Sequence, residues 1–185
     1  MKTELNNNGG YEAEGVIWHQ HSNRLLKKII EYFPNNIPVT DIGCGHNFYI
    51  SILRYLGNKN AWGVDLVDLG SRYFVTQDVT EPVVEIDEIS NVISLEVGEH
   101  IPEELASNYL DNITAFKGDV IMSWAIPGQE GIGHINCQTN DWVISEMKAR
   151  GYEIDVERTA ELRGAVYDCH CSWFKNTLFY FFPNK

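Results

Sequence analysis

One stretch limits the fold of this chain more than any other: Val39-Thr40-Asp41-Ile42-Gly43-Cys44-Gly45-His46-Asn47. An apolar run ends at an acidic residue, two glycines follow with one residue between them, and a helical pattern begins at Phe48. Glycines let the backbone approach a ligand closely, and a helix start offers unpaired N–H groups. A strand, a glycine turn and a helix therefore predict a pocket for a small polar ligand. A tight turn without a ligand is the simpler alternative.

The spacing of the glycines narrows the choice of ligand. Nicotinamide and flavin cofactors are bound by a three-glycine fingerprint, and its third position falls on Phe48 here. A carboxylate two residues before the first glycine instead suits a ligand with a positive charge near the turn. We expect Asp41 at the carboxyl end of a strand over residues 37–42, where ligands bind in open α/β sheets.

The D-x-G-x-G pattern resembles the first motif of class I S-adenosylmethionine (SAM)-dependent methyltransferases. That family usually has a third glycine at the position of Asn47, and Asn tolerates left-handed backbone and caps helices well. The resemblance implies SAM as the cofactor and S-adenosylhomocysteine as its product. The cofactor-binding residues that it implies at the turn are Asp41, Gly43, Cys44 and Gly45.

A second acid follows the next predicted strand. Asp65 ends a short apolar run over residues 61–65, about 20 residues beyond the glycine turn. An acid at that distance accepts the ribose hydroxyls of an adenosine-containing ligand through charge-assisted hydrogen bonds. We therefore predict that Asp65 and the adjacent Leu66 bind the cofactor, whereas a helix cap is the alternative role for Asp65.

The link from Asp65 to Asp78 has only about a dozen residues. It includes a predicted strand over residues 73–76, so the helix that normally crosses between strands two and three is missing or reduced to a single turn. The resemblance implies that Asp78 faces the adenine amino group and that Val79 reads the ring edge. A plain turn residue is the alternative for Asp78.

The segment after the fourth predicted strand, residues 91–96, carries a further resemblance. Ser94-Leu95-Glu96-Val97-x-Glu99-His100-Ile101-Pro102 is similar to the methyltransferase motif that faces the methionine end of SAM. This implies that Glu96 binds the cofactor. His100 is a candidate base or a wall of the cofactor pocket, and a structural role is the alternative.

The fifth predicted strand, residues 119–126, leads into a polar, glycine-rich loop over residues 127–138. The string Trp124-Ala125-x-Pro127-Gly128-Gln129, with a later His134-x-Asn136, resembles one branch of class I methyltransferase-like proteins. We predict that His134 is the catalytic base, because imidazole titrates near neutral pH, or that it only stiffens the loop. Trp124, Gln129 and Asn136 are predicted to shape or hydrogen-bond the acceptor.

The remaining pattern completes an α/β chain. The helical patterns cover residues 16–33, 47–57, 102–116 and 140–150, with strands over 152–156 and 176–182 and a helix or loop over 157–166. The sequence predicts a Rossmann-like, doubly wound, mostly parallel seven-stranded sheet with an antiparallel last strand and helices on both faces. Residues 1–36 form an N-terminal segment and lid helix, and residues 37–185 form the methyltransferase domain, one domain overall. Trp18 is expected in the core with His19 and His21 in solvent, or this segment closes over the cofactor.

Composition excludes several classes of protein. The 185 residues carry a formal charge of −12 and no basic run, which argues against nucleic acid or an anionic membrane as partner. No stretch approaches the roughly 20 apolar residues of a membrane helix, and the polar start is unlike a signal peptide, so we expect a cytoplasmic protein. We predict no metal site, because Cys169-His170-Cys171 lacks the spacing of a zinc site. Nothing in the residues specifies an oligomeric state.

Together these features predict an enzyme, a SAM-dependent methyltransferase that transfers a methyl group to an oxygen or nitrogen of a small-molecule or sugar-like acceptor. The alternative is a SAM- or nucleotide-binding protein without catalysis. A nicotinamide-dependent oxidoreductase is a weaker rival, because the third glycine is missing.

Overall fold

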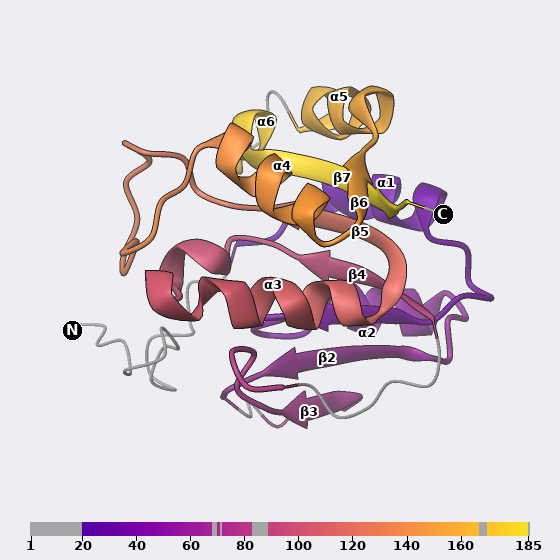
Figure 1. Ribbon diagram of the computed structural model, residues 1–185. Helices are drawn as coiled ribbons and strands as arrows, with labels where there is room; N and C mark the ends of the chain where they lie inside the picture. Colours follow the sequence, from indigo (N-terminus) through magenta and orange to yellow (C-terminus); the bar gives the residue numbers. More distant parts are fainter. Residues whose placement is uncertain (1–19, 68–69, 71, 83–88, 167–169, 185) are drawn as a thin grey trace.

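A computed structural model describes residues 20–67, 70, 72–82, 89–166 and 170–184 of the chain (Figure 1). They form a seven-stranded sheet in the order β3-β2-β1-β4-β5-β7-β6. The strands are β1 (Val39–Ile42), β2 (Ala61–Asp65), β3 (Phe74–Thr76), β4 (Ser90–Ser94), β5 (Lys117–Ser123), β6 (Tyr152–Ile154) and β7 (Leu178–Pro183). β7 alone is antiparallel to its neighbours in this sheet, which confirms the predicted fold class.

Helices cover both faces of the sheet, as predicted (Figure 1). They are α1 (Asn23–Tyr32), α2 (Phe48–Tyr55), α3 (Ala106–Ala115), α4 (Asn140–Ala149), α5 (Val156–Ala165) and α6 (Phe174–Thr177), with two 3-10 turns, η2 (Gly98–His100) and η3 (Glu103–Leu105). Residues of α1, α2, α5 and α6 share one hydrophobic cluster. Residues of α3 and α4 belong to the cluster on the opposite face.

The two central strands are buried throughout, although both carry polar residues. Every residue of β1 and of β4 is buried, as expected for parallel strands covered by helices on both sides. Several of the polar side chains within them are paired locally; for example, Thr40 Oγ1 lies 3.0 Å from Ser90 Oγ. Because β1, β2, β4 and β5 are parallel, their carboxyl ends share one edge of the sheet.

Several elements differ in their bounds from the sequence prediction, and for three segments the local reason is clear. Helix α1 begins at Asn23, because the Ser22 side chain accepts a hydrogen bond from the N–H of Leu25; residues 16–19 lie outside the described residues. The segment 157–166 is helical, because Asp155 caps α5 in the same way. The last strand begins at Leu178 and not at Asn176, since the short helix α6 occupies the preceding residues.

The connection from β2 to β3 contains no helix among its described residues. This agrees with the short link that the sequence predicts, and β3 pairs in parallel with β2 directly. Within the described ranges, no helix has the length and hydropathy needed to span a bilayer.

Helix α1 is integrated into the core. Leu25 and Ile29 are fully buried, the N–H of Ser22 donates to the hydroxyl of Tyr49 at 3.0 Å, and Lys28 Nζ pairs with Glu161 of α5 at 2.9 Å. The helix thus covers the sheet, and only the residues before it reach the cavity described below. The expectations for Trp18 and His19 lie outside the described residues.

If α1 is a core element, truncating its buried face will destabilise the whole protein. We expect Ile29→Ala to lower the free energy of unfolding by about 2–5 kcal/mol in urea denaturation, as for other large-to-small core changes. Lys27→Ala, on the exposed side of the same helix, is the control and should change it by less than about 0.5 kcal/mol. If both substitutions changed the free energy of unfolding by the same small amount, α1 would not be part of the hydrophobic core.

Candidate functional site

A cavity of about 790 Å³ opens at the carboxyl ends of the central strands. Its walls come from segments far apart in the sequence: the glycine turn after β1, Glu96 after β4, the loop after β5, and the stretches that precede α1 and begin α6. The cavity therefore lies where the sequence predicts ligand binding, at the edge shared by the parallel strands.

The glycine turn requires left-handed backbone at three positions. Gly43, Gly45 and Asn47 have φ of 75°, 51° and 59°. A side chain at Gly43 would also meet Val97, since a Cβ there would lie 2.4 Å from Val97 Cγ2. Asn47 takes the place of the family's third glycine, but its side chain does not cap α2. Instead, its Nδ2 donates to the carbonyl of Arg72 at 3.0 Å, which ties the turn to the start of β3.

Asp41 lines the cavity as a buried carboxyl group. Its side chain is 3% exposed, and burial, together with the charge of Asp65, raises its pKa to about 8. Burial likewise raises the pKa of the Cys44 thiol beside it, so this thiol stays protonated at neutral pH. A cation in the cavity would favour the ionised form of Asp41.

Asp65 lies against the glycine turn. The N–H of Gly45 donates to Asp65 Oδ2 at 2.8 Å, and the N–H of Val67 donates to Oδ1 at 3.3 Å. Asp65 and the half-buried Leu66 are not in the wall of the cavity among the described residues. An ionised carboxylate has about four acceptor positions, so Asp65 retains capacity for a ligand beyond these two bonds.

Asp78 and Val79 lie away from the cavity and belong to a turn. Asp78 Oδ1 accepts from the N–H of Thr80 at 2.9 Å and from its hydroxyl at 2.7 Å. The carbonyl of Val79 accepts from Asn112 Nδ2 at 2.7 Å. Asp78 therefore acts as a turn residue, which was the alternative for it in the sequence analysis. The predicted contact of Asp78 with adenine stays a prediction.

Glu96 stands over the cavity in a strained conformation. Its φ is 54°. Left-handed backbone is energetically unfavourable for a residue other than glycine, and it persists only where the surrounding structure fixes the residue. Its N–H donates to Ser123 Oγ at 2.8 Å, and its Oε2 accepts from Gln129 Nε2 at 2.7 Å. Burial raises the pKa of Glu96. Gln129, which also lines the cavity, thus links the loop after β5 to the end of β4.

The loop over residues 127–138 is held on η2 by backbone bonds. The carbonyl of Glu99 accepts from the N–H groups of Ile135 and Asn136, both at 2.9 Å. Trp124 Nε1 donates to the carbonyl of Asn136 at 2.7 Å. The Trp124 ring packs against Gly98, and any larger residue there would clash with it, because a Cβ on Gly98 would lie only 2.4 Å from the ring.

Two of the predicted substrate-contacting residues lie behind the cavity wall. Trp124 and Asn136 are buried, at 0% and 4% exposure, and neither lines the cavity. They support the loop from the core side, and their contact with an acceptor stays a prediction. Gln129 and His134 remain on the cavity wall.

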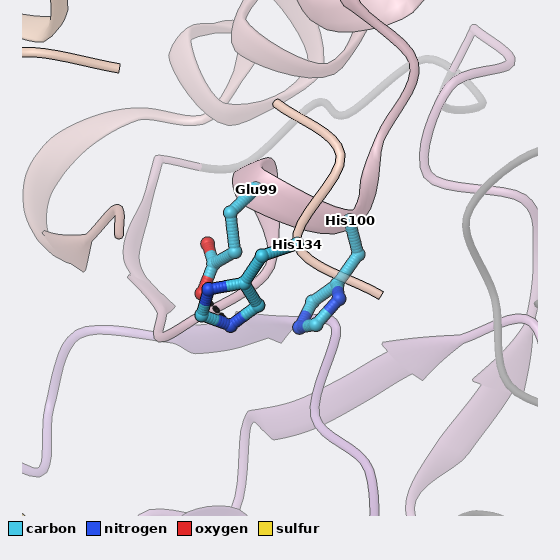
Figure 2. A group of neighbouring side chains, drawn as sticks. All are labelled: Glu99, His100 and His134. Atoms are coloured by element: carbon cyan, nitrogen blue, oxygen red, sulfur yellow. Dashed lines mark ion pairs between the residues drawn. The ribbon is translucent and has the colours of Figure 1, made fainter. Parts of the chain in front are cut away.

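The loop brings His134 next to Glu99 and His100 of η2 (Figure 2). His134 Nε2 lies 3.8 Å from Glu99 Oε1, and the two imidazole rings meet edge to face with centroids 5.1 Å apart. Glu99 is fully buried, and burial and the charge of Glu96 raise its pKa well above the usual range. Both histidines line the cavity.

Sequence reasoning missed Glu99 as a member of this site. The signal available was its position beside His100 immediately after a predicted strand. Cys169 lies outside the described residues, and the nearby His170 Nε2 is 3.1 Å from the carbonyl of His21.

Comparison with solved structures places the fold. The chain is similar to magnesium protoporphyrin IX methyltransferase from Synechocystis, solved with bound SAM (TM-score 0.55, 17% identity, covering 75% of this chain and 78% of that one). It is also similar to 1,6-didemethyltoxoflavin-N1-methyltransferase from Burkholderia thailandensis, solved with its substrate and S-adenosylhomocysteine (TM-score 0.53, 18% identity, covering 86% and 74%). A third similar structure is the cyclase SpnF (TM-score 0.62, 12% identity, covering 100% and 87%).

At these identities the likeness establishes a shared Rossmann-like methyltransferase fold. No protein-family model matches the chain. The search of curated proteins found no match either.

The buried Asp41 predicts a specific pH dependence of stability. Its folded pKa of about 8 exceeds the unfolded value of about 3.9. The folded protein therefore binds more protons between these values, and this group's contribution to stability falls as the pH rises from about 4 to about 8. We expect Asp41→Asn to gain stability relative to the wild type as the pH is raised over this range, measured by urea denaturation. Parallel curves for the two proteins would contradict the burial of a titrating group; Asp141→Asn, at an exposed position, is the control.

Proposed function

We propose that this protein is a SAM-dependent methyltransferase. The observation that carries the proposal is the buried carboxyl group of Asp41 on the wall of the cavity, beside a glycine turn that holds the second acid, Asp65. The sulfonium and ammonium of SAM carry two positive charges against the one negative charge of its carboxylate, and these cationic groups would offset the cost of ionising a buried acid. Two structures with this fold hold SAM or S-adenosylhomocysteine.

The orientation of the cofactor follows from the positions of the acids. The ammonium group of SAM would lie between Asp41 and Glu96, two acids of the cavity wall. The ribose would extend over the glycine turn to Asp65, at the end of β2. This places the methyl group toward the loop after β5, where Gln129 and His134 line the remaining part of the cavity.

The acceptor side suits an oxygen or nitrogen nucleophile. The sulfonium already activates the methyl group, so the protein must position the acceptor in line and assist the loss of its proton. His134, held by the loop and next to Glu99, is the group that we assign to this assistance, with His100 beside it. A small-molecule or sugar-like acceptor fits a cavity of about 790 Å³.

The alternative is a protein that binds SAM or a nucleotide without methyl transfer. The similarity to a protein named as a cyclase shows that this fold is not confined to methyltransferases. The two functions separate when calorimetric binding of SAM is combined with a mass-spectrometric search for methylated products among candidate acceptors. Binding without any product over all acceptor classes would favour the alternative, and tight binding of NADH in place of SAM would revive an oxidoreductase.

Asp65→Asn tests the ribose contact. The amide keeps an acceptor oxygen for the N–H of Gly45 but loses the charge that strengthens two hydrogen bonds to the ribose. Hydrogen bonds to a charged group contribute about 1.5–3 kcal/mol, so we expect SAM to bind about 10- to 100-fold more weakly by calorimetry. Asp141→Asn serves as the matched control. An unchanged Kd in Asp65→Asn would refute this placement of the ribose.

His134→Ala tests the acceptor side separately from the cofactor side. We expect it to bind SAM with an affinity within about threefold of wild type while product formation falls at least about 100-fold, in the range of general acid–base effects. His170→Ala, an exposed residue that is not on the cavity wall, is the control for loss of a histidine. Full turnover by His134→Ala would rule out a direct role for this imidazole.

A further inference from the structure

Glu99, His100 and His134 form a cluster at the inner edge of the cavity. Each offers one ligand atom, and these atoms all lie within 4.8 Å of one another. Figure 2 shows the Glu99 carboxylate directed at the His134 ring, with the His100 ring on the other side of His134. Two nitrogens and one carboxylate are a common donor set for divalent transition metals.

Both histidines are oriented through the nitrogen that faces the protein. Nδ1 of His100 lies 3.1 Å from the carbonyl of Gly133, and Nδ1 of His134 lies 3.1 Å from the carbonyl of Gln129. A carbonyl only accepts, so Nδ1 is the donor in each ring, and in the neutral imidazole the lone pair is then on Nε2. Metal-binding histidines are held in this way, with the second nitrogen donating to a carbonyl.

The Glu99 carboxyl group is the second, independent indication. It is fully buried, and no hydrogen bond of regular geometry reaches either of its oxygens among the described residues, although the Glu96 carboxyl group and the backbone of Ala125 lie near it. A buried polar group without a partner is costly. The nearest cationic candidate is His134, whose Nε2 is 3.8 Å away. A metal ion between them would satisfy the carboxylate.

We propose that Glu99, His100 and His134 bind one divalent transition-metal ion, for which Zn²⁺ is the probe. Ligand atoms around tetrahedral zinc lie about 3.3 Å apart, so the 3.8 Å between His134 Nε2 and Glu99 Oε1 needs only a small closure. Glu99 and His100 are adjacent on η2, and the backbone bonds from Ile135 and Asn136 to Glu99 fix the loop that brings His134. The donors come from three side chains, which leaves the remaining coordination position for a ligand in the cavity.

The role of the metal rests on the proposed methyl transfer. An acceptor hydroxyl bound at the remaining position would have a lowered pKa and would release its proton to solvent. The acceptor oxygen would then attack the methyl carbon of SAM. The new O–C bond would form as the C–S bond breaks, and the electron pair of the C–S bond would stay on sulfur. His134 would thus assist the acceptor as a metal ligand, and this proposal departs from the sequence-based expectation of no metal.

Calorimetric titration of chelator-treated protein with ZnCl₂ tests the site. We expect one ion per chain, with at least about tenfold weaker binding in Glu99→Gln and in His134→Ala and unchanged binding in His170→Ala. Circular dichroism and SAM affinity confirm that each variant is folded. Absence of zinc binding, or equal binding by wild type and Glu99→Gln, would overturn the proposal. So would binding that survives Glu99→Gln and disappears in Cys137→Ser, because Cys137 Sγ lies 3.9 Å from His134 Nδ1.

Experiments can refute the proposed metal site and the proposed function independently of each other. Protein that binds SAM without zinc would refute the site and leave methyl transfer standing. Protein that binds zinc through Glu99 and His134 but does not bind SAM would refute the proposed function and leave the site. Product formation that persists unchanged after chelator treatment would overturn the role given to the metal in turnover.

Discussion

A carboxylic acid buried at the end of the first strand is the constraint on which the rest of this structure depends. Asp41 has little access to water, and the charge of Asp65 nearby opposes its ionisation. An acid in this position weakens the unliganded protein at neutral pH, because the charged form is poorly solvated. A cationic ligand would remove that cost, so the same residue that reduces stability would favour a cationic ligand over a neutral one.

The glycine turn connects this acid to the second strand. Left-handed backbone at Gly43 and Gly45 turns the chain sharply, and the N–H of Gly45 then reaches Asp65. Asn47 extends the same connection toward β3, where a helix would cross in a longer protein of this fold. The side chain of Asn47 thus holds the segment before β3 against the glycine turn.

The opposite wall of the cavity is formed by the loop over residues 127–138, which backbone hydrogen bonds hold in place. The loop that carries His134 is long and polar, and its backbone is fixed by two N–H groups that share the carbonyl of Glu99. Trp124 supports the loop from the core side, because Gly98 leaves room for its ring. The geometry around His134 and His100 thus depends on backbone contacts as much as on the two side chains.

Much of this arrangement could be predicted from the residues. Most of the strands and helices, the short link after β2 and the place of the glycine turn follow from local patterns of apolar residues and glycine, whereas the arrangement of the sheet was implied by the resemblance to class I methyltransferases. The burial of Trp124 does not, because it depends on the absence of a side chain at Gly98, a position distant in sequence. Glu99 was missed for a similar reason: its partner His134 approaches only when the loop folds back.

The most direct test of the central claim is a crystal structure of the protein with S-adenosylhomocysteine. We predict that the nucleoside lies across the carboxyl ends of β1 and β2. Its ribose hydroxyls should lie within hydrogen-bond distance of Asp65, and its amino group should lie between Asp41 and Glu96. An empty cavity at saturating ligand, or a nucleoside bound away from Asp65, would contradict it.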